Sequence, residues 1–202
     1  TKTARSQIHQ VIGKVLGVGL ITSEGDLWKR QRRLLQPLFT KKSVREYEPT
    51  MVRIAKEVIG GWHDTTGREP LRMDQLTFDY AVRIILECVL GKPTQADWRH
   101  ISDLLNLLGE YLEQYIAKPF LLPFWVPVPL NVKINNKSKE LTDCIQAVID
   151  ELAVAERDEN GANLVRFMKD HPEQTAQQIL DEVRTVFIAG HETSASTLAW
   201  AC

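Results

Sequence analysis

The segment that most constrains the fold is FIAGHETSASTLAWAC, the sixteen residues from Phe187 to Cys202, which are apolar or small on nearly every side. A helix of this composition is typical of the buried centre of a large protein. We expect it to begin near Thr175 and to run to the end of the chain, because no glycine or proline stop and no basic final turn closes it. A central helix without a stop indicates missing sequence, so we interpret the chain as a fragment.

Shorter helical stretches precede this final helix. Amphipathic periodicity and glycine or proline stops predict helices over residues 27–36, 47–62, 74–90, 97–115 and 132–157, and a short segment over residues 164–170. Side-chain oxygens of residues 23–26 and of Asp74 are expected to cap two of them, and residues 69–73 are the one plausible strand. Four prolines in residues 119–129 forbid a regular helix there. The sequence therefore predicts a mainly α fold, one incomplete domain over residues 1–202.

Composition limits the class of protein and its compartment. A net charge of −1 argues against a partner made of nucleic acid, which would select a basic excess. Cys88, Cys144 and Cys202 are widely spaced and form no C-x-x-C pair, which indicates reduced thiols. No run of eighteen apolar residues occurs in the sequence. We therefore expect a cytoplasmic location, although a membrane anchor before residue 1 stays open.

The most informative motif is the segment from Ala189 to Thr193 in the final helix. Thr193 follows Gly190 by three residues and Ala189 by four, so the three residues lie along one helix face. The two small residues let a flat group approach the backbone closely. Thr193 adds a hydroxyl that can donate and accept a hydrogen bond, and Glu192 adds a titratable acid beside it. Simple packing of a second helix against the small residues is the alternative, and the sequence leaves both open.

The neighbouring pair His191 and Glu192 also invites a zinc-protease interpretation. The motif H-E-x-x-H binds zinc through two histidines one helical turn apart. Ala195 stands where the second histidine is required. No metal site is therefore predicted in this chain.

A second motif lies in the predicted helix over residues 27–36. Trp28 and Arg32 are four residues apart, so an indole N–H and a guanidinium share one face. This donor pair suits a carboxylate or a phosphate. The other cations, Lys29, Arg30 and Arg33, point elsewhere and favour an acidic protein partner. The alternative interpretation is a solvated basic face with the tryptophan packed in the core.

Together the two segments resemble the cytochrome P-450 family of haem-thiolate monooxygenases. The W-x-x-x-R of Trp28 to Arg32 is similar to the motif on that family's helix C, and the A-G-x-E-T of Ala189 to Thr193 is similar to the oxygen-activation motif of its helix I. The order between them is similar too: helices, a proline-rich segment, a long helix and then helix I. The resemblance implies a cytochrome P-450-type helical fold that is incomplete at its C-terminal, haem-thiolate part.

The resemblance also implies cofactor contacts. Trp28 and Arg32 would donate hydrogen bonds to a propionate of haem b, and Ala189 and Gly190 would lie over the distal face of the haem. Electrons from NAD(P)H would arrive through a partner, a ferredoxin or a flavin reductase, docked at the basic face of helix C.

The resemblance implies catalytic roles as well. Thr193 would hold O2 and, together with Glu192, deliver the protons that cleave the O–O bond. Residues 119–129 would form a mobile lid over the entrance for an apolar small-molecule substrate.

One element that the resemblance implies is missing from this sequence. The family binds iron through a cysteine in an F-x-x-G-x-R-x-C loop, and neither this loop nor the E-x-x-R pair of a later helix is present. We therefore expect the chain alone to be inactive. Two alternatives stay open: a non-catalytic helical domain that binds a partner or an apolar ligand, and a family member that does isomerase or dehydratase work without O2.

Overall fold

The computed structural model describes residues 12–13, 15–65, 72–90, 97–118, 122–154 and 164–201. The elements in chain order are α2 (Gly25–Leu35), the short 3₁₀ helix η1 (Gln36–Phe39), α3 (Lys41–Thr65), α4 (Met73–Ile84), the π-helical η2 (Ile85–Leu90), α5 (Trp98–Ile116), α6 (Pro129–Val154), α7 (Leu164–Lys169) and α8 (Ala176–Ala201). No strand occurs among these described residues, so the predicted mainly α fold is confirmed. None of the described helices is both long and apolar enough to cross a membrane.

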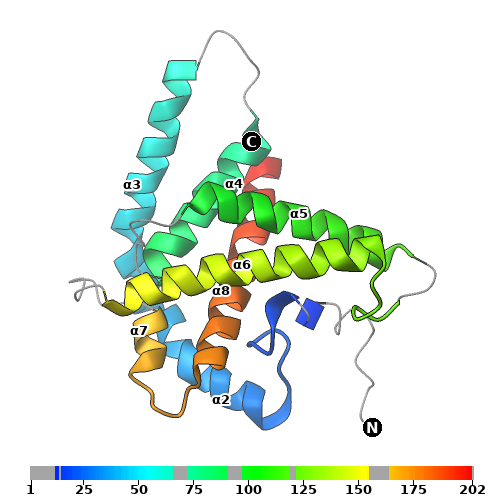
Figure 1. Cartoon of the computed structure of the whole chain (residues 1–202). Helices are drawn as coiled ribbons and strands as arrows, with labels where there is room; N and C mark the ends of the chain where they lie inside the picture. The colour runs from blue at the N-terminus through cyan, green and yellow to red at the C-terminus, as the bar shows by residue number, and fades with distance from the viewer. Residues whose placement is uncertain are drawn as a thin grey trace.

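The final helix, α8, lies at the centre of the fold. α4 packs along it, and α6, with α5 beside it, crosses it (Figure 1). The first half of α8 is buried almost continuously from Ile179 to Phe187. Its apolar side chains join one cluster with residues of α4, α5, α6 and α7. Burial of such side chains provides the main stabilisation of a helical fold.

The second half of α8 is covered on fewer sides than the first half. Thr193, Thr197 and Trp200 are exposed, Trp200 to 91%. Small and apolar composition allows burial, but the neighbouring helices decide which turns they cover.

The start of α3 was predicted too late. The helix begins at Lys41, where the hydroxyl of Thr40 accepts a hydrogen bond from the backbone N–H of Ser43 at 3.3 Å. Pro49 lies inside the helix instead of in its first turn, although an interior proline costs about 3 kcal/mol. Tyr47 and Ile54 are buried on either side of this proline. Tertiary packing therefore stabilises the helix on both sides of Pro49.

The two predicted helix caps are also wrong. Asp74 lies in the first turn of α4 and pairs with Arg72 at 2.6 Å, whereas the N-cap residue is Arg72, which makes no side-chain cap. At α2 the N-cap residue is Glu24, again without a side-chain cap hydrogen bond. Of the predicted strand, Met73 is helical and residues 69–71 lie outside the described residues.

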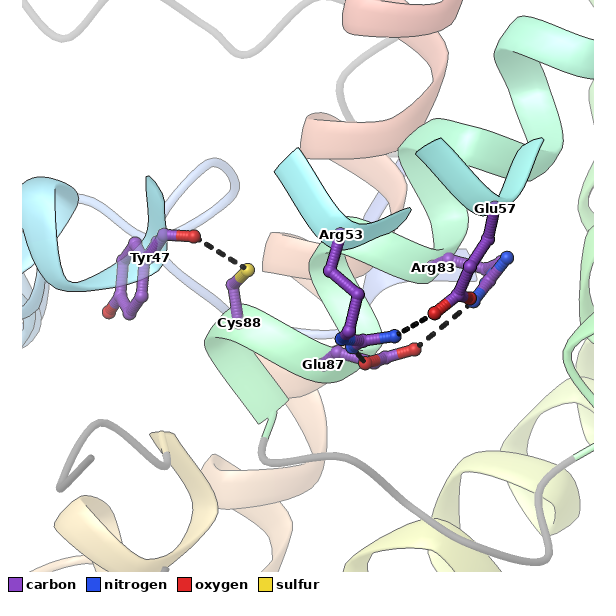
Figure 2. Close-up of polar contacts among 6 residues, drawn as sticks. All are labelled: Tyr47, Arg53, Glu57, Arg83, Glu87 and Cys88. Atoms are coloured by element: carbon purple, nitrogen blue, oxygen red, sulfur yellow. Dashed lines mark hydrogen bonds and ion pairs between the residues drawn. The ribbon is translucent and has the colours of Figure 1, made fainter. Parts of the chain in front are cut away.

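Four charged side chains join α3 to the end of α4. Figure 2 shows Arg53 and Glu57 of α3 reaching across to Arg83 and Glu87. Arg53 binds both carboxylates, with 2.7 Å between its Nη1 and Oε1 of Glu57, and Arg83 also binds both. Hydrogen bonds from Arg83 and Arg53 hold the pKa of the Glu57 carboxyl below its usual value. Because Glu87 belongs to η2, this network ties the π-helical turn to α3.

A buried acid lies in the first half of α8. Glu182 has no exposed surface, and one of its oxygens accepts a hydrogen bond from the backbone N–H of Leu20 at 3.0 Å. Burial raises the pKa of the Glu182 carboxyl from its usual 4.5 to about 7, the Leu20 hydrogen bond opposes this shift, and the neighbouring charge of Asp181 adds to it. The folded protein therefore binds this proton more tightly than the unfolded chain does.

This shift predicts how stability depends on pH. The contribution of Glu182 is fully present below pH about 4.5 and is lost as the pH rises through about 7. Glu182→Gln should remove this loss, because glutamine has no proton to release. Between pH 5 and pH 8 the free energy of unfolding of the parent chain should therefore fall by up to about 3 kcal/mol more than that of the variant. Denaturant titrations at several pH values measure the difference. Asp143→Asn, at an exposed pair with Lys139, should leave the profile unchanged, and parallel profiles for Glu182→Gln and the parent would contradict the prediction.

Candidate functional site

The Ala189–Thr193 motif on α8 has one exposed side and one side packed against η2. The hydroxyl of Thr193 donates a hydrogen bond to the carbonyl oxygen of Ala189 at 2.9 Å, which confirms that these residues share one stripe, and Thr193 is exposed. Gly190 faces η2 instead: a Cβ atom placed on it would lie 2.4 Å from Cδ1 of Ile85. The close approach expected at Gly190 is therefore made by a packed side chain in this structure. Contact of Ala189 and Gly190 with a haem stays a prediction.

Glu192 lines a cavity between three helices. This cavity has a volume of about 770 Å³ and lies between α4, α5 and α8. Its wall combines apolar side chains such as Leu105 and Ile188 with acidic ones such as Asp103 and Glu192. Glu192 is exposed, so its carboxyl can exchange protons with water in the cavity.

His191, beside Glu192, is a buried structural residue. Its ring nitrogen Nδ1 lies 2.8 Å from the carbonyl oxygen of Phe187, and the ring meets Phe78 of α4 edge to face at 4.7 Å between centroids. Burial lowers the pKa of the imidazole, which is therefore neutral near pH 7. No group of three potential metal-ligating side chains occurs within the described ranges. His191 thus anchors α8 to α4.

The second motif lies on the exposed face of α2. The guanidinium carbon of Arg32 is 5.3 Å from the centroid of the Trp28 ring, a cation–π contact that holds both donors on one face. Trp28 is 37% exposed, so the alternative of a tryptophan packed in the core is not supported. The other cations of α2 are exposed as well, and Lys29, Arg30 and Arg33 line a hollow of about 580 Å³ shared with Phe167.

The predicted lid is irregular but well attached where the structure describes it. Residues 122–128 form no helix, which confirms the effect of the prolines, and residues 119–121 lie outside the described ranges. Asn131 donates hydrogen bonds to the carbonyl oxygens of Pro123 and Val126 at 2.9 and 3.0 Å. Asn135 donates to that of Phe124 at 3.0 Å. α6 thus holds the base of the segment, and opening of a lid stays a prediction.

The described cysteines do not resemble iron ligands. The Sγ of Cys88 lies 4.0 Å from the carbonyl oxygen of Tyr47 (Figure 2). Burial, reinforced by the charge of Glu87, raises the pKa of this thiol to about 11. The pKa of Cys144 is also raised, mainly by burial, whereas Cys202 lies outside the described residues. Because the thiolate is the form that binds metal, neither described cysteine is prepared for iron.

The sequence interpretation missed the buried acids of α8. Asp181 and Glu182 are 4% and 0% exposed, and both bind the backbone of residues 17–22. A signal was present, because two adjacent carboxylates stand in a helix that is otherwise predicted to be buried. The upstream glycines Gly17 and Gly19 lie against α8 at these acids. The structure shows that these two features contact each other.

The arrangement is that of a helical domain organised around one central helix, with an acid and a hydroxyl on that helix and a tryptophan–arginine pair on an earlier one. The sequence model of the cytochrome P-450 family matches residues 2–202. The chain therefore belongs to the cytochrome P-450 family, as the two motifs predicted.

Individual relatives agree with this assignment. The chain is 28% identical to cyclooctatin synthase of Streptomyces melanosporofaciens over 196 residues, which cover 93% of the chain and 41% of that protein. It is 25% identical over 198 residues to cyclooctat-9-en-7-ol 5-monooxygenase of the same organism, with the same coverage. The chain thus spans about two fifths of the length of these curated relatives.

The solved structures show the same fold. The crystal structure of a six-coordinated cytochrome P-450 from Thermus thermophilus matches with a TM-score of 0.71 at 20% identity, covering 98% of this chain and 45% of that one. The predicted P-450-type helical fold, present in part, is confirmed.

The contact between Gly190 and Ile85 predicts that substitutions at these two positions have strongly non-additive effects on stability. Gly190→Ala should destabilise the chain by about 1–2 kcal/mol, because the new methyl group overlaps Cδ1 of Ile85. Ile85→Val removes that atom and should itself cost about 1 kcal/mol. In the Ile85→Val background, Gly190→Ala should become neutral or stabilising, which a double-mutant cycle by thermal unfolding measures.

A matched control is available in α5. A Cβ atom on Gly109 would meet nothing within 4 Å, so Gly109→Ala should stabilise by about 0.5–1 kcal/mol in either background. Additive effects of the substitutions at positions 190 and 85 would contradict the assigned contact.

Proposed function

We propose that this chain is part of a haem-thiolate monooxygenase whose complete form inserts one oxygen atom of O2 into an apolar organic substrate. Electrons would come from NAD(P)H through a redox partner. The observation that carries the proposal is the pairing of a Trp28–Arg32 donor face with the Glu192–Thr193 pair in a chain of the cytochrome P-450 family. The monooxygenase name of one relative from Streptomyces supports it.

The described residues fit the edge of a haem but not its iron. The indole N–H of Trp28 and the guanidinium of Arg32 stand on one exposed face, which suits a propionate of haem b. The thiols of Cys88 and Cys144 both have raised pKa values and do not suit the axial position. We therefore propose that the iron-ligating cysteine belongs to a part of the protein outside this chain, and that the chain alone is inactive.

The chain's own residues would bind the cofactor and move protons. When bound, the haem supplies the oxidation chemistry. Trp28 and Arg32 would hold a propionate, and Ala189 would face the distal side, whereas Gly190 packs against Ile85 in this structure. Because its proton is donated to the Ala189 carbonyl oxygen, the Thr193 hydroxyl keeps its lone pairs free to accept a hydrogen bond.

Glu192 would supply protons to that hydroxyl. Its carboxyl lines the large cavity and is exposed, so it can be reprotonated from water without a conformational change. General acid catalysis needs an acid that can regain its proton from solvent, and the exposed position of Glu192 allows this.

The redox partner and the location are further parts of the proposal. A ferredoxin or a flavin reductase with an acidic surface would dock at the cations of α2, which are exposed. Reversing the charges of Arg30 and Arg33 should slow electron transfer most at low salt, and an unchanged rate would rule out this face. The cytoplasmic location rests on the unpaired cysteines and is tested by cell fractionation.

The donor face on α2 gives the first test of the proposal. In a longer protein that contains this chain and the thiolate loop, Arg32→Ala should weaken haem binding about 10- to 100-fold, because a charge-assisted hydrogen bond is lost. Absorption titrations with haem measure this affinity. Lys29→Ala, on the same helix and paired with Asp26 at 3.2 Å, should change it little. Equal haem affinity for the parent and Arg32→Ala would contradict the role of α2.

The hydroxyl of Thr193 gives the second test. Thr193→Val keeps the shape but removes the hydroxyl, so product formation in the longer protein should fall about 10²-fold. Thr193→Ser should retain most of the rate. Thr197 bonds the carbonyl oxygen of Thr193 at 2.7 Å on the same stripe, and Thr197→Val serves as the control for a lost helical hydroxyl. A similar loss in both valine variants would show a structural effect only.

A further inference from the structure

The segment just before α2 is seated directly on α8. The backbone N–H of Val18 donates to Oδ2 of Asp181 at 2.9 Å, and that of Leu20 donates to Oε2 of Glu182 at 3.0 Å. The turn formed by residues 17–22 is closed internally as well, because the hydroxyl of Thr22 donates to the carbonyl oxygen of Gly17 at 2.7 Å. Two N–H groups of one turn therefore bind two adjacent carboxylates of one helix.

Two glycines allow the turn to approach α8 this closely. Gly17 has a φ of 75°, and a Cβ atom on it would lie 2.1 Å from Oδ1 of Asp181. A Cβ atom on Gly19 would lie 2.1 Å from Oγ1 of Thr185 and 2.8 Å from the carbonyl oxygen of Asp181. The turn thus touches both the side chains and the backbone of α8, and a side chain at either glycine would lift it away.

The carboxylates act through these directed contacts. Both are buried, and the remaining oxygen of Asp181 accepts a hydrogen bond from the amide of Gln177 at 2.9 Å. The nearby buried Arg184 instead donates to Ser138 of α6 at 3.2 Å. Burying acidic groups is costly, and apolar side chains would serve packing alone at least as well. Two buried acids that each accept a hydrogen bond from a backbone N–H of the turn therefore indicate a specific hydrogen-bonded position for it.

Because the turn lies directly before α2 in the chain, its position determines where α2 begins. This helix begins at Gly25, three residues after Thr22, and no side-chain hydrogen bond caps it at Glu24. A second tie runs from the amide of Gln31 in α2 to that of Gln174, next to the start of α8, at 3.2 Å. α2 is therefore attached to α8 at the turn before its first residue and again near its middle.

We propose that Asp181 and Glu182 are positioning residues, which hold the turn of residues 17–22 on α8 and thereby fix where α2 presents Trp28 and Arg32. The proposal deepens the proposed function, since it assumes that α2 contacts the haem. Neither acid touches the cofactor in this assignment. They act through the backbone of residues 17–22.

Hydrogen exchange measured by mass spectrometry on the 202-residue chain tests the proposal. Glu182→Leu removes the acceptor for the Leu20 N–H, so amides of residues 17–24 and of α2 should exchange at least about 10-fold faster, while α5 and α6 stay unchanged. Glu182→Gln keeps an acceptor oxygen and should retain most of the protection. Asp143→Asn is the control for a lost surface carboxylate. Faster exchange in the turn but not in α2, or equally faster exchange in every helix, would overturn the positioning role.

A second variant covers the case in which Glu182→Leu does not fold. Gly19→Ala leaves every residue of α8 intact but overlaps Thr185, so it should raise exchange in the same two segments. Unchanged exchange there would also overturn the proposal. This readout needs no haem. A longer protein that binds no haem would contradict the proposed function and leave the exchange result to decide the role of the two acids.

Discussion

The packing of α4 and η2 along α8 is the contact on which the rest of the structure depends. Among the described elements, no other pair of helices shares so extensive an interface. Gly190 is central to it, because only a residue without a side chain lets Ile85 reach the backbone of α8. The edge-to-face contact of Phe78 with His191 lies on the same interface. α6 and α7 also pack against α8, and α5 packs on α4 and α6.

Acidic side chains join separate segments of the fold at two places. At the N-terminal half of α8 the acceptors are the carboxyl groups of Asp181 and Glu182, and the donors are backbone N–H groups of the preceding turn. At the far side of α4, two arginines and two glutamates share several hydrogen bonds at a partly exposed position, where water lowers the cost of the charges. The first arrangement joins the N-terminal segment to α8, and the second joins α3 to η2.

Much of the helical content was predictable because it depends on local periodicity. The predicted bounds of α2, α5, α7 and the start of α8 agree with the structure within a few residues. The errors fall where tertiary contacts outweigh local preference. Pro49 marks a helix start by local rules, yet buried neighbours carry α3 through it. The contact of the turn before α2 with Asp181 could not be predicted from local patterns, because the two segments are more than 160 residues apart in the sequence.

The sequence by itself determined the family, the central position of the last helix and the pairs Trp28–Arg32 and Ala189–Thr193, since each depends on residue type and a spacing of three or four along one helix. Only the tertiary structure decided which group lies against each face. It placed Ile85 against Gly190, left Thr193 exposed and seated the glycine turn on Asp181 and Glu182. Helical periodicity determines which residues share a face. Which segment packs against that face depends on residues far away in the sequence, so local patterns do not predict it.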